Sequence, residues 1–120
     1  MDIDYGEAGG SDGPSFYDPG RPDALTWLQG WYATHSDGHW EHEYGVRIET
    51  IDNPGWSVEI DLSGTELGGR IFEEFEIHRS PDDWLTAWVE VDKWKLACGP
   101  LNLAEGLHRF RAWAGDIPEH

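Results

Sequence analysis

Two runs of alternating apolar and polar residues, separated by a Pro-Gly turn, constrain the fold of this chain most. Apolar side chains occupy every second position in residues 46–50, and the same period returns in residues 56–62. Alternation with period two is typical of a strand with one buried face. The stretch between the runs, Asp52-Asn-Pro-Gly55, is composed of turn-forming residues. The sequence therefore predicts an antiparallel β-hairpin.

The register of this hairpin follows because opposite residues must lie on the same face of the sheet. The register that places the apolar residues together leaves a loop of odd length and makes four pairs: Gly45 with Asp61, Val46 with Ile60, Arg47 with Glu59, and Ile48 with Val58. Glu49, Glu59 and Asp61 then surround Arg47 on the outer face. We expect an acidic cluster there, and the alternative is a solvated sheet face with one cross-strand ion pair.

Apolar residues at helical spacing predict one helix before the hairpin and another near the end of the chain. Asp23 is the expected N-cap of the first helix, which ends at residues 36–38. The second helix is expected to start at Asn102, whose spacing to Glu105 is that of a capping box. Gly115 is the expected end of this helix.

Three further strands are predicted between the hairpin and the second helix. Their ranges are 71–79, 84–91 and 94–98, with a turn at 80–83 and a tight hairpin at Asp92-Lys93. The fold class is therefore α+β, an antiparallel sheet of four to five strands in a meander, flanked by an N-terminal and a C-terminal helix on one face. Residues 23–117 form the predicted domain, and residues 1–22 form an acidic leader rich in Gly, Asp, Ser and Pro.

The strand at residues 84–91 is apolar on both faces. Either both faces are covered, as in a homodimer, or Trp84 and Trp88 form an exposed aromatic ledge. The chain holds eight tryptophans in 120 residues. We expect most of them to be half-buried, with the ring packed and the indole N–H bonded. A monomer and a homodimer are both compatible with this pattern.

The charge of the chain limits its partners. The 24 acidic residues outnumber the 8 Lys and Arg residues, and the formal net charge is −16. This excess argues against nucleic acid and against an anionic membrane surface, and it suits a basic protein partner. Cys98 is the only cysteine, so no intrachain disulfide can form, and a cytoplasmic protein is expected. No apolar run approaches the length of a membrane span.

Few residues form a pattern with known chemistry. His35, His39 and His42 lie close in sequence among carboxylates, but their spacing matches no recognised metal motif. A structural His42 bonded to a nearby carboxylate or carbonyl is the preferred interpretation. Paired carboxylates with Trp residues would suit a carbohydrate-binding or hydrolytic domain, and Cys98 has no evident base beside it. We therefore expect a binding protein without a cofactor, a metal or catalytic activity.

Several segments resemble one protein family. They are Trp27-Leu-Gln with Trp31-Tyr32, Asp37-Gly with Trp40-Glu-His42 and Tyr44-Gly45, Asp52-Asn-Pro-Gly-Trp-Ser57, Phe72-Glu-Glu74 with Glu76, Asp82-Asp-Trp84, Gly99-Pro100 and Asn102-Leu103. In this combination, from about Asp23 to Trp113, the chain resembles the immunity protein 53 family of bacterial polymorphic toxin systems. The resemblance implies a protein that binds a cognate toxin domain and blocks it without catalysis.

The residues and the resemblance together suggest where a toxin would bind. An acidic protein could cover the cationic cleft of a nuclease, and long-range attraction would speed association. The candidate partner-binding residues are Asp37, Trp40, Glu41, His42, Tyr44, Glu49, Glu59 and Asp61. Trp40, His42 and Tyr44 also alternate, so they could instead be an inward-facing set at the start of the first strand.

Overall fold

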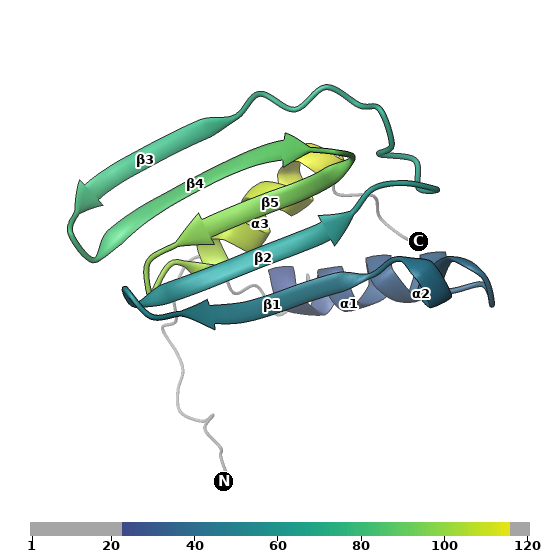
Figure 1. Cartoon of the computed structure of the whole chain (residues 1–120), viewed down its shortest axis with the longest axis horizontal. Coiled ribbons are helices and arrows are strands. Elements are labelled where there is room, and N and C mark those ends of the chain that lie inside the picture. The colour runs from purple at the N-terminus through teal and green to yellow at the C-terminus, as the bar shows by residue number, and fades with distance from the viewer. Residues whose placement is uncertain (1–22, 116–120) are drawn as a thin grey trace, which may run out of the picture.

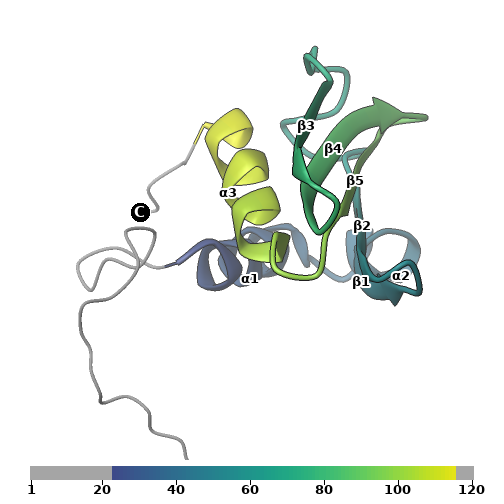
Figure 2. The same cartoon turned by 90° about the vertical axis from the view of Figure 1, so that its left-hand side faces the viewer.

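Five antiparallel strands form one sheet, and two long helices lie side by side on one face of it (Figures 1 and 2). The computed structural model describes residues 23–115. In chain order the elements are α1 (Ala24–His35), α2 (Trp40–Glu43), β1 (Val46–Ile51), β2 (Gly55–Asp61), β3 (Phe75–Ser80), β4 (Asp83–Glu90), β5 (Lys93–Cys98) and α3 (Leu103–Ala114). The predicted α+β class is confirmed, while the leader at residues 1–22 lies outside the described part.

The strand order is β1-β2-β5-β4-β3. The sheet is meander-like, because β1–β2, β3–β4 and β4–β5 are hairpins between consecutive strands. It departs from a strict meander where β2 pairs with β5 and the connection from β2 to β3 runs around the end of the sheet (Figure 1). This pairing brings Lys93 and Lys95 beside β2, which matters for the outer face.

The predicted register of the first hairpin is confirmed. Val46 pairs with Ile60, Arg47 with Glu59, and Ile48 with Val58. The backbone N–H of Asp61 donates to the carbonyl oxygen of Gly45, as the predicted register requires. Residues 52–54 form the loop, which has the expected odd length.

The inner face of the sheet packs on α1 and α3. Alternate residues of the central strands are fully buried there, and they are Val58, Ile60, Leu85, Ala87, Trp94, Leu96 and Cys98. Phe110 of α3 contacts the rings of Trp94 and Trp31 at centroid distances of 5.0 and 5.4 Å. Of the eight tryptophans, Trp31, Trp40 and Trp94 are buried and the other five are half-buried. Burial on this scale accounts for the stability of the domain.

The helix boundaries agree with the sequence at all four ends, and Asn102 is the N-cap of α3 as predicted. The Asp23 carboxylate accepts a hydrogen bond from the N–H of Thr26, and Ser36 is the C-cap of α1. Gly115 ends α3 in the left-handed conformation, at φ 100°. The capping box at Asn102 does not form, because the Asn102 side-chain oxygen instead accepts the backbone N–H of Trp84.

Three other local predictions were wrong. β3 starts at Phe75, and Ile71 is 89% exposed in the loop before it. The β4–β5 turn consists of Val91 and Asp92, both with positive φ, so it begins one residue earlier than predicted. The short helix α2 replaces the expected extended start of β1 at residues 40–43.

Within residues 23–115, no helix is long and apolar enough to cross a membrane.

Candidate functional site

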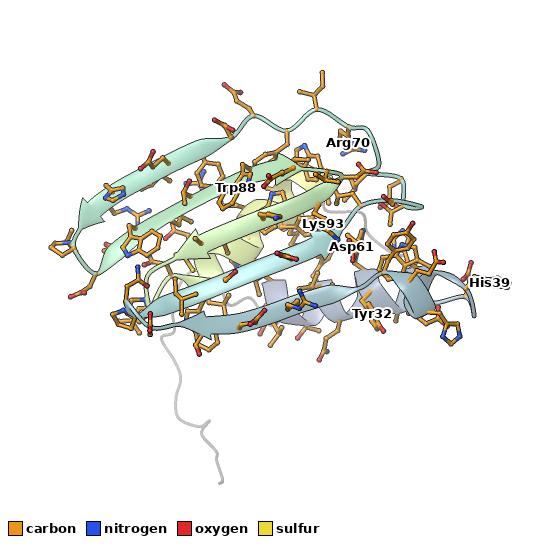
Figure 3. The ribbon with its side chains drawn as sticks, in the orientation of Figure 1. Tyr32, His39, Asp61, Arg70, Trp88 and Lys93 are labelled. Carbon is orange, nitrogen blue, oxygen red and sulfur yellow. The ribbon has the colours of Figure 1, made fainter. Side chains whose placement is uncertain are left out.

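The outer face of the sheet is the candidate site, because none of the helices in residues 23–115 covers it (Figure 2). We call it the open face. Its side chains alternate with the buried ones, and they are Arg47, Glu49, Ser57, Glu59, Asp61, Glu76, His78, Trp84, Thr86, Trp88, Glu90, Lys93, Lys95 and Ala97. In Figure 3, Trp88 lies on β4 and Asp61 lies beside Lys93 at one end of the neighbouring strands.

A row of alternating charges crosses the open face. Arg47 on β1 lies 3.7 Å from Glu59 on β2, and Glu59 lies 3.7 Å from Lys95 on β5. Lys95 also lies 3.5 Å from Glu90 on β4. Such exposed pairs each contribute on the order of 0–1 kcal/mol, so their effect is to balance charge rather than to stabilise the fold.

The acidic cluster predicted on β1 and β2 is therefore partly neutralised. Lys95 approaches Glu59, and the Lys93 ammonium donates to the Asp61 carboxylate. The bond to Asp61 raises the pKa of Lys93, which keeps the amine charged. The sequence did not reveal this compensation, because it depends on the pairing of β2 with β5, which are separated by more than thirty residues.

The side chains at the centre of the open face are small and uncharged. Ser57, Ala97 and Thr86 pair across β2, β5 and β4 in one row. On β4, Thr86 lies between Trp84 and Trp88, and both tryptophans are half-buried. The His78 ring stacks near Trp84, with centroids 6.2 Å apart and an interplanar angle of 24°. An uncharged centre with aromatic neighbours and a charged rim is the composition typical of a protein–protein interface.

The α2 segment holds the other predicted binding residues. One oxygen of the Asp37 side chain accepts the backbone N–H groups of His39 and Trp40. The bond from Trp40 is the main reason that the pKa of Asp37 is lowered. Glu41 accepts the N–H of Gly38 in the same turn. These carboxylates therefore hold the backbone of the segment as well as carrying negative charge.

Trp40 belongs to the core. It is 7% exposed, its indole N–H donates to the carbonyl oxygen of Ser63, and its ring contacts Trp31 and Tyr44. Of the two interpretations that the sequence left open for Trp40, the structure shows burial. The interpretation of Trp40, His42 and Tyr44 as the inward-facing residues of a strand was nevertheless wrong. This segment is helical, and His42 is exposed.

The candidate residues of the α2 segment and those of the β1–β2 hairpin meet at Gly45. The Asp61 carboxylate accepts the N–H of Gly45, which follows α2 by two residues. Half-buried Tyr44 lies next to this junction, whereas His39 lies at the far end of the molecule from Trp88 (Figure 3). The structure thus brings Asp61 to the α2 segment and keeps Glu49 and Glu59 further along the strands.

His35 has the structural role that was expected of His42. Its Nδ1 lies 2.8 Å from the carbonyl oxygen of Trp31, and its Nε2 lies 2.7 Å from Glu66. The Trp31 indole N–H donates to the same Glu66 carboxylate. Within the described residues, no three His, Cys, Asp or Glu side chains are grouped as a metal ion would require. Burial raises the pKa of the Cys98 thiol to about 11, which disfavours the thiolate.

One feature of the open face was missed at the sequence level. A hollow of about 370 Å³ lies between β3 and β4, and its lining includes Glu74, Glu76, Thr86 and Trp88. Alternation in the strand predicted at residues 71–79 puts Glu74 and Glu76 on the same face, opposite Ile71, Phe75 and Ile77. The sequence also left open an exposed aromatic ledge that includes Trp88. Pairing these two strands across the predicted turn at 80–83 would have placed Glu74 and Glu76 beside Trp88.

These features define a small α+β domain with an uncovered, polar and aromatic sheet face. The model of the family described as immunity protein 53 matches residues 25–115. The chain belongs to the immunity protein 53 family. Comparisons with curated proteins and with solved structures gave no match.

Proposed function

We propose that this protein binds the cognate toxin domain of a bacterial polymorphic toxin system and neutralises it without catalysis. Membership of the immunity protein 53 family supports this proposal. The site of action that suits the protein is the cytoplasm of the producing cell, where its single cysteine, buried and free, would stay reduced.

The uncovered open face is the observation that carries the proposal. A sheet with one solvated face needs only polar side chains there, yet Trp84 and Trp88 are both half-buried on this face. Large aromatic side chains are enriched where interfaces hold most of their binding energy. The small residues Ser57, Ala97 and Thr86 would let a partner surface approach the sheet closely.

A cationic nuclease is the proposed type of toxin. The net charge of −16 would attract a phosphate-binding cleft over long range and raise the association rate. Salt would weaken this attraction, since the Debye length falls to about 8 Å at physiological ionic strength.

The proposed binding surface keeps most of the predicted residues. Asp37, Glu41, His42, Tyr44, Glu49, Glu59 and Asp61 stay in the proposal as groups at the rim of the open face and on the adjoining α2 segment. Trp40 acts indirectly, because its buried ring holds α2 against α1 rather than touching a partner. The carbohydrate-binding, hydrolytic and metal-binding alternatives stay untested predictions, as does the choice between a monomer and a homodimer.

A growth-rescue experiment tests this function. The toxin domain encoded next to this gene is expressed in cells with and without the chain, and survival and co-purification are scored. Rescue with a stable complex supports the proposal. If cells die equally with and without the chain and no complex forms, the assignment to this toxin is wrong.

The electrostatic part has its own test. Reversing the charge of Glu49, Glu59 and Asp61 together should slow association with the toxin most at low salt. An association rate that does not change at low salt would refute steering by these residues.

A further inference from the structure

We propose that the hollow between β3 and β4 binds an arginine side chain of the toxin. This inference rests on the proposed function, since it names a specific contact within the toxin-binding surface. The hollow lies outside the α2 and β1–β2 region to which the sequence pointed.

The strand register builds the hollow. Glu76 on β3 pairs with Thr86 on β4, and Phe75 pairs with Ala87, so the residue before Phe75 comes opposite Trp88. That residue is Glu74, which lies just outside the first residue of β3. The side chains of Glu74, Glu76 and Trp88 thus meet on the open face around a space of about 370 Å³. This space is large enough for the end of a long side chain.

The Trp88 ring is held by a hydrogen bond to a residue of its own strand. Its indole N–H donates to the Glu90 carboxylate at 3.2 Å, and this bond is the main reason that the pKa of Glu90 is lowered. Glu90 is in turn paired with Lys95. This bond limits the rotation of the ring, and Trp88 is one of the residues that line the hollow.

The charge of the hollow differs from that of the rest of the open face. On β1, β2 and β4 each carboxylate has a basic neighbour, as Glu59 has Arg47 and Lys95. Among the described residues, none of those that line the hollow is Lys or Arg. Glu76 lies 3.4 Å from the His78 ring, and the two side chains are 71% and 65% exposed. A cation from a partner would therefore complete the charge pattern of the sheet at this place.

Arginine fits this hollow better than lysine does. A guanidinium is planar, so it can stack on the indole face of Trp88 while its N–H groups donate to the two carboxylates. A lysine ammonium is a compact, strongly hydrated charge that gains less from a flat aromatic wall. The combination of one fixed ring and two acids thus selects a guanidinium.

The first test measures the affinity of the toxin domain for three variants. The double variant Glu74→Gln/Glu76→Gln and the variant Trp88→Leu should each raise Kd about tenfold or more, equivalent to ~1.4 kcal/mol. Trp88→Phe, which keeps an aromatic face, should retain part of the affinity. Urea denaturation of each variant confirms that it is folded.

Glu73→Gln is the matched control. It removes the same charge one position away, and Glu73 does not line the hollow. Its Kd should stay within about twofold of the wild-type value, within ~0.4 kcal/mol. If Glu73→Gln weakens binding as much as Glu74→Gln/Glu76→Gln does, a diffuse charge effect replaces the proposed contact. If the double variant and Trp88→Leu both bind as tightly as the wild type, the proposal is overturned while the proposed function stands.

The second test does not need the toxin. The ¹⁵N-labelled chain is titrated with N-acetyl-arginine amide and, separately, with the neutral isostere N-acetyl-citrulline amide. The indole N–H signal of Trp88 should shift in a saturable way with the arginine compound alone, and the shift should disappear in Glu74→Gln/Glu76→Gln. An absent shift, or equal shifts with both compounds, would overturn the proposal even if the wild-type chain binds no toxin.

Discussion

Replacing Gly106 with alanine should destabilise this protein, although the same change usually stabilises a helix. Gly106 lies in α3 where that helix crosses the inner face of β5. A Cβ added there would lie 2.3 Å from Leu96 Cδ2, 3.0 Å from Cδ1 and 3.2 Å from Cγ. Carbon atoms in contact are normally about 3.5–4.0 Å apart, so Leu96 or the helix would have to move by about 1 Å.

The cost follows from how closely Leu96 is packed. The Leu96 side chain is 1% exposed, so it lies within the packed core. Forcing an extra methyl group into such a core costs about 1–3 kcal/mol. The gain in helix propensity from Gly to Ala is roughly 1 kcal/mol, and the net result is a loss of about 0–2 kcal/mol.

Gly30 in α1 provides the matched control. A Cβ at Gly30 would have no atom within 4 Å, so the change to alanine carries the propensity gain alone. Gly30→Ala should therefore stabilise the protein by about 0.5–1 kcal/mol. The difference between the two variants isolates the clash with Leu96, and we expect it to be about 1–3 kcal/mol.

Urea denaturation followed by tryptophan fluorescence measures both free energies of unfolding. In a domain of this size, 1 kcal/mol also shifts Tm by about 4–8 °C. Equal stabilisation by Gly106→Ala and Gly30→Ala would refute the packing of α3 on β5. That packing is what leaves the opposite face of the sheet as the one available to a partner.

Three further predictions concern buried or bonded groups. Trp40→Ala should lower the free energy of unfolding by about 3–5 kcal/mol, because it leaves a cavity beneath α1 and the Ser63 carbonyl loses its hydrogen-bond donor. Urea denaturation measures this change, and a loss below about 1 kcal/mol would contradict the burial of Trp40. Desolvation raises the pKa of Glu66, but the hydrogen bonds from its own backbone N–H, from His35 and from Trp31 together lower it below the ordinary value. The stability that Glu66 provides should therefore be present above its unfolded pKa and lost as the pH falls through the lower folded value. Urea denaturation between pH 6 and pH 3, roughly the range around an ordinary Glu pKa, should show this loss of stability. The loss should be smaller in Glu66→Gln. An identical pH dependence in the wild type and in Glu66→Gln would disprove the role of Glu66. The Cys98 thiol is buried, so it should react with a disulfide reagent only as fast as the protein unfolds. The reaction is followed at pH 8, about half a unit below the ordinary thiol pKa. Fast reaction of the native protein would contradict the burial of Cys98.

The sequence predicted those parts of the fold that depend on local pattern. The β1–β2 register follows from alternation around Asp52–Gly55, because a shift by one residue would turn Val58 and Ile60 outward. The boundaries of α1 and α3 follow from Asp23 and Gly115, since cap residues satisfy backbone groups within one turn.

Tertiary contacts decided the segments that the sequence did not predict. Residues 40–44 alternate like a strand, but a turn of helix forms there instead. It buries Trp40 against Trp31 and bonds it to Ser63, and the Asp37 carboxylate accepts the N–H of Trp40 at its start. Asn102 could have closed a capping box with Glu105, yet its side chain is used to bond the backbone of Trp84 on β4. In both cases a contact distant in sequence replaced a local preference.

The charge of the candidate site could be predicted only in part. Arg47 opposite Glu59 follows from the hairpin register, whereas Lys93 and Lys95 come from a strand that pairs non-locally with β2. Acids counted along β1 and β2 therefore overstate the negative charge of that region. The hollow at Glu74, Glu76 and Trp88 depends on the β3–β4 pairing, which also includes an irregularity between His78 and Ser80.

The most direct test of a toxin-binding open face compares two Ala→Arg variants. Ala97 is half-buried at the centre of the open face, between Ser57 and Thr86, and Ala104 is exposed on α3. The Kd of the toxin domain is measured by isothermal titration calorimetry for both variants, after urea denaturation has shown that each is folded. We predict that Ala97→Arg weakens binding at least about 100-fold, ~2.7 kcal/mol, while Ala104→Arg binds like the wild type. Wild-type affinity in Ala97→Arg, or a loss confined to Ala104→Arg, would contradict the assignment of this face.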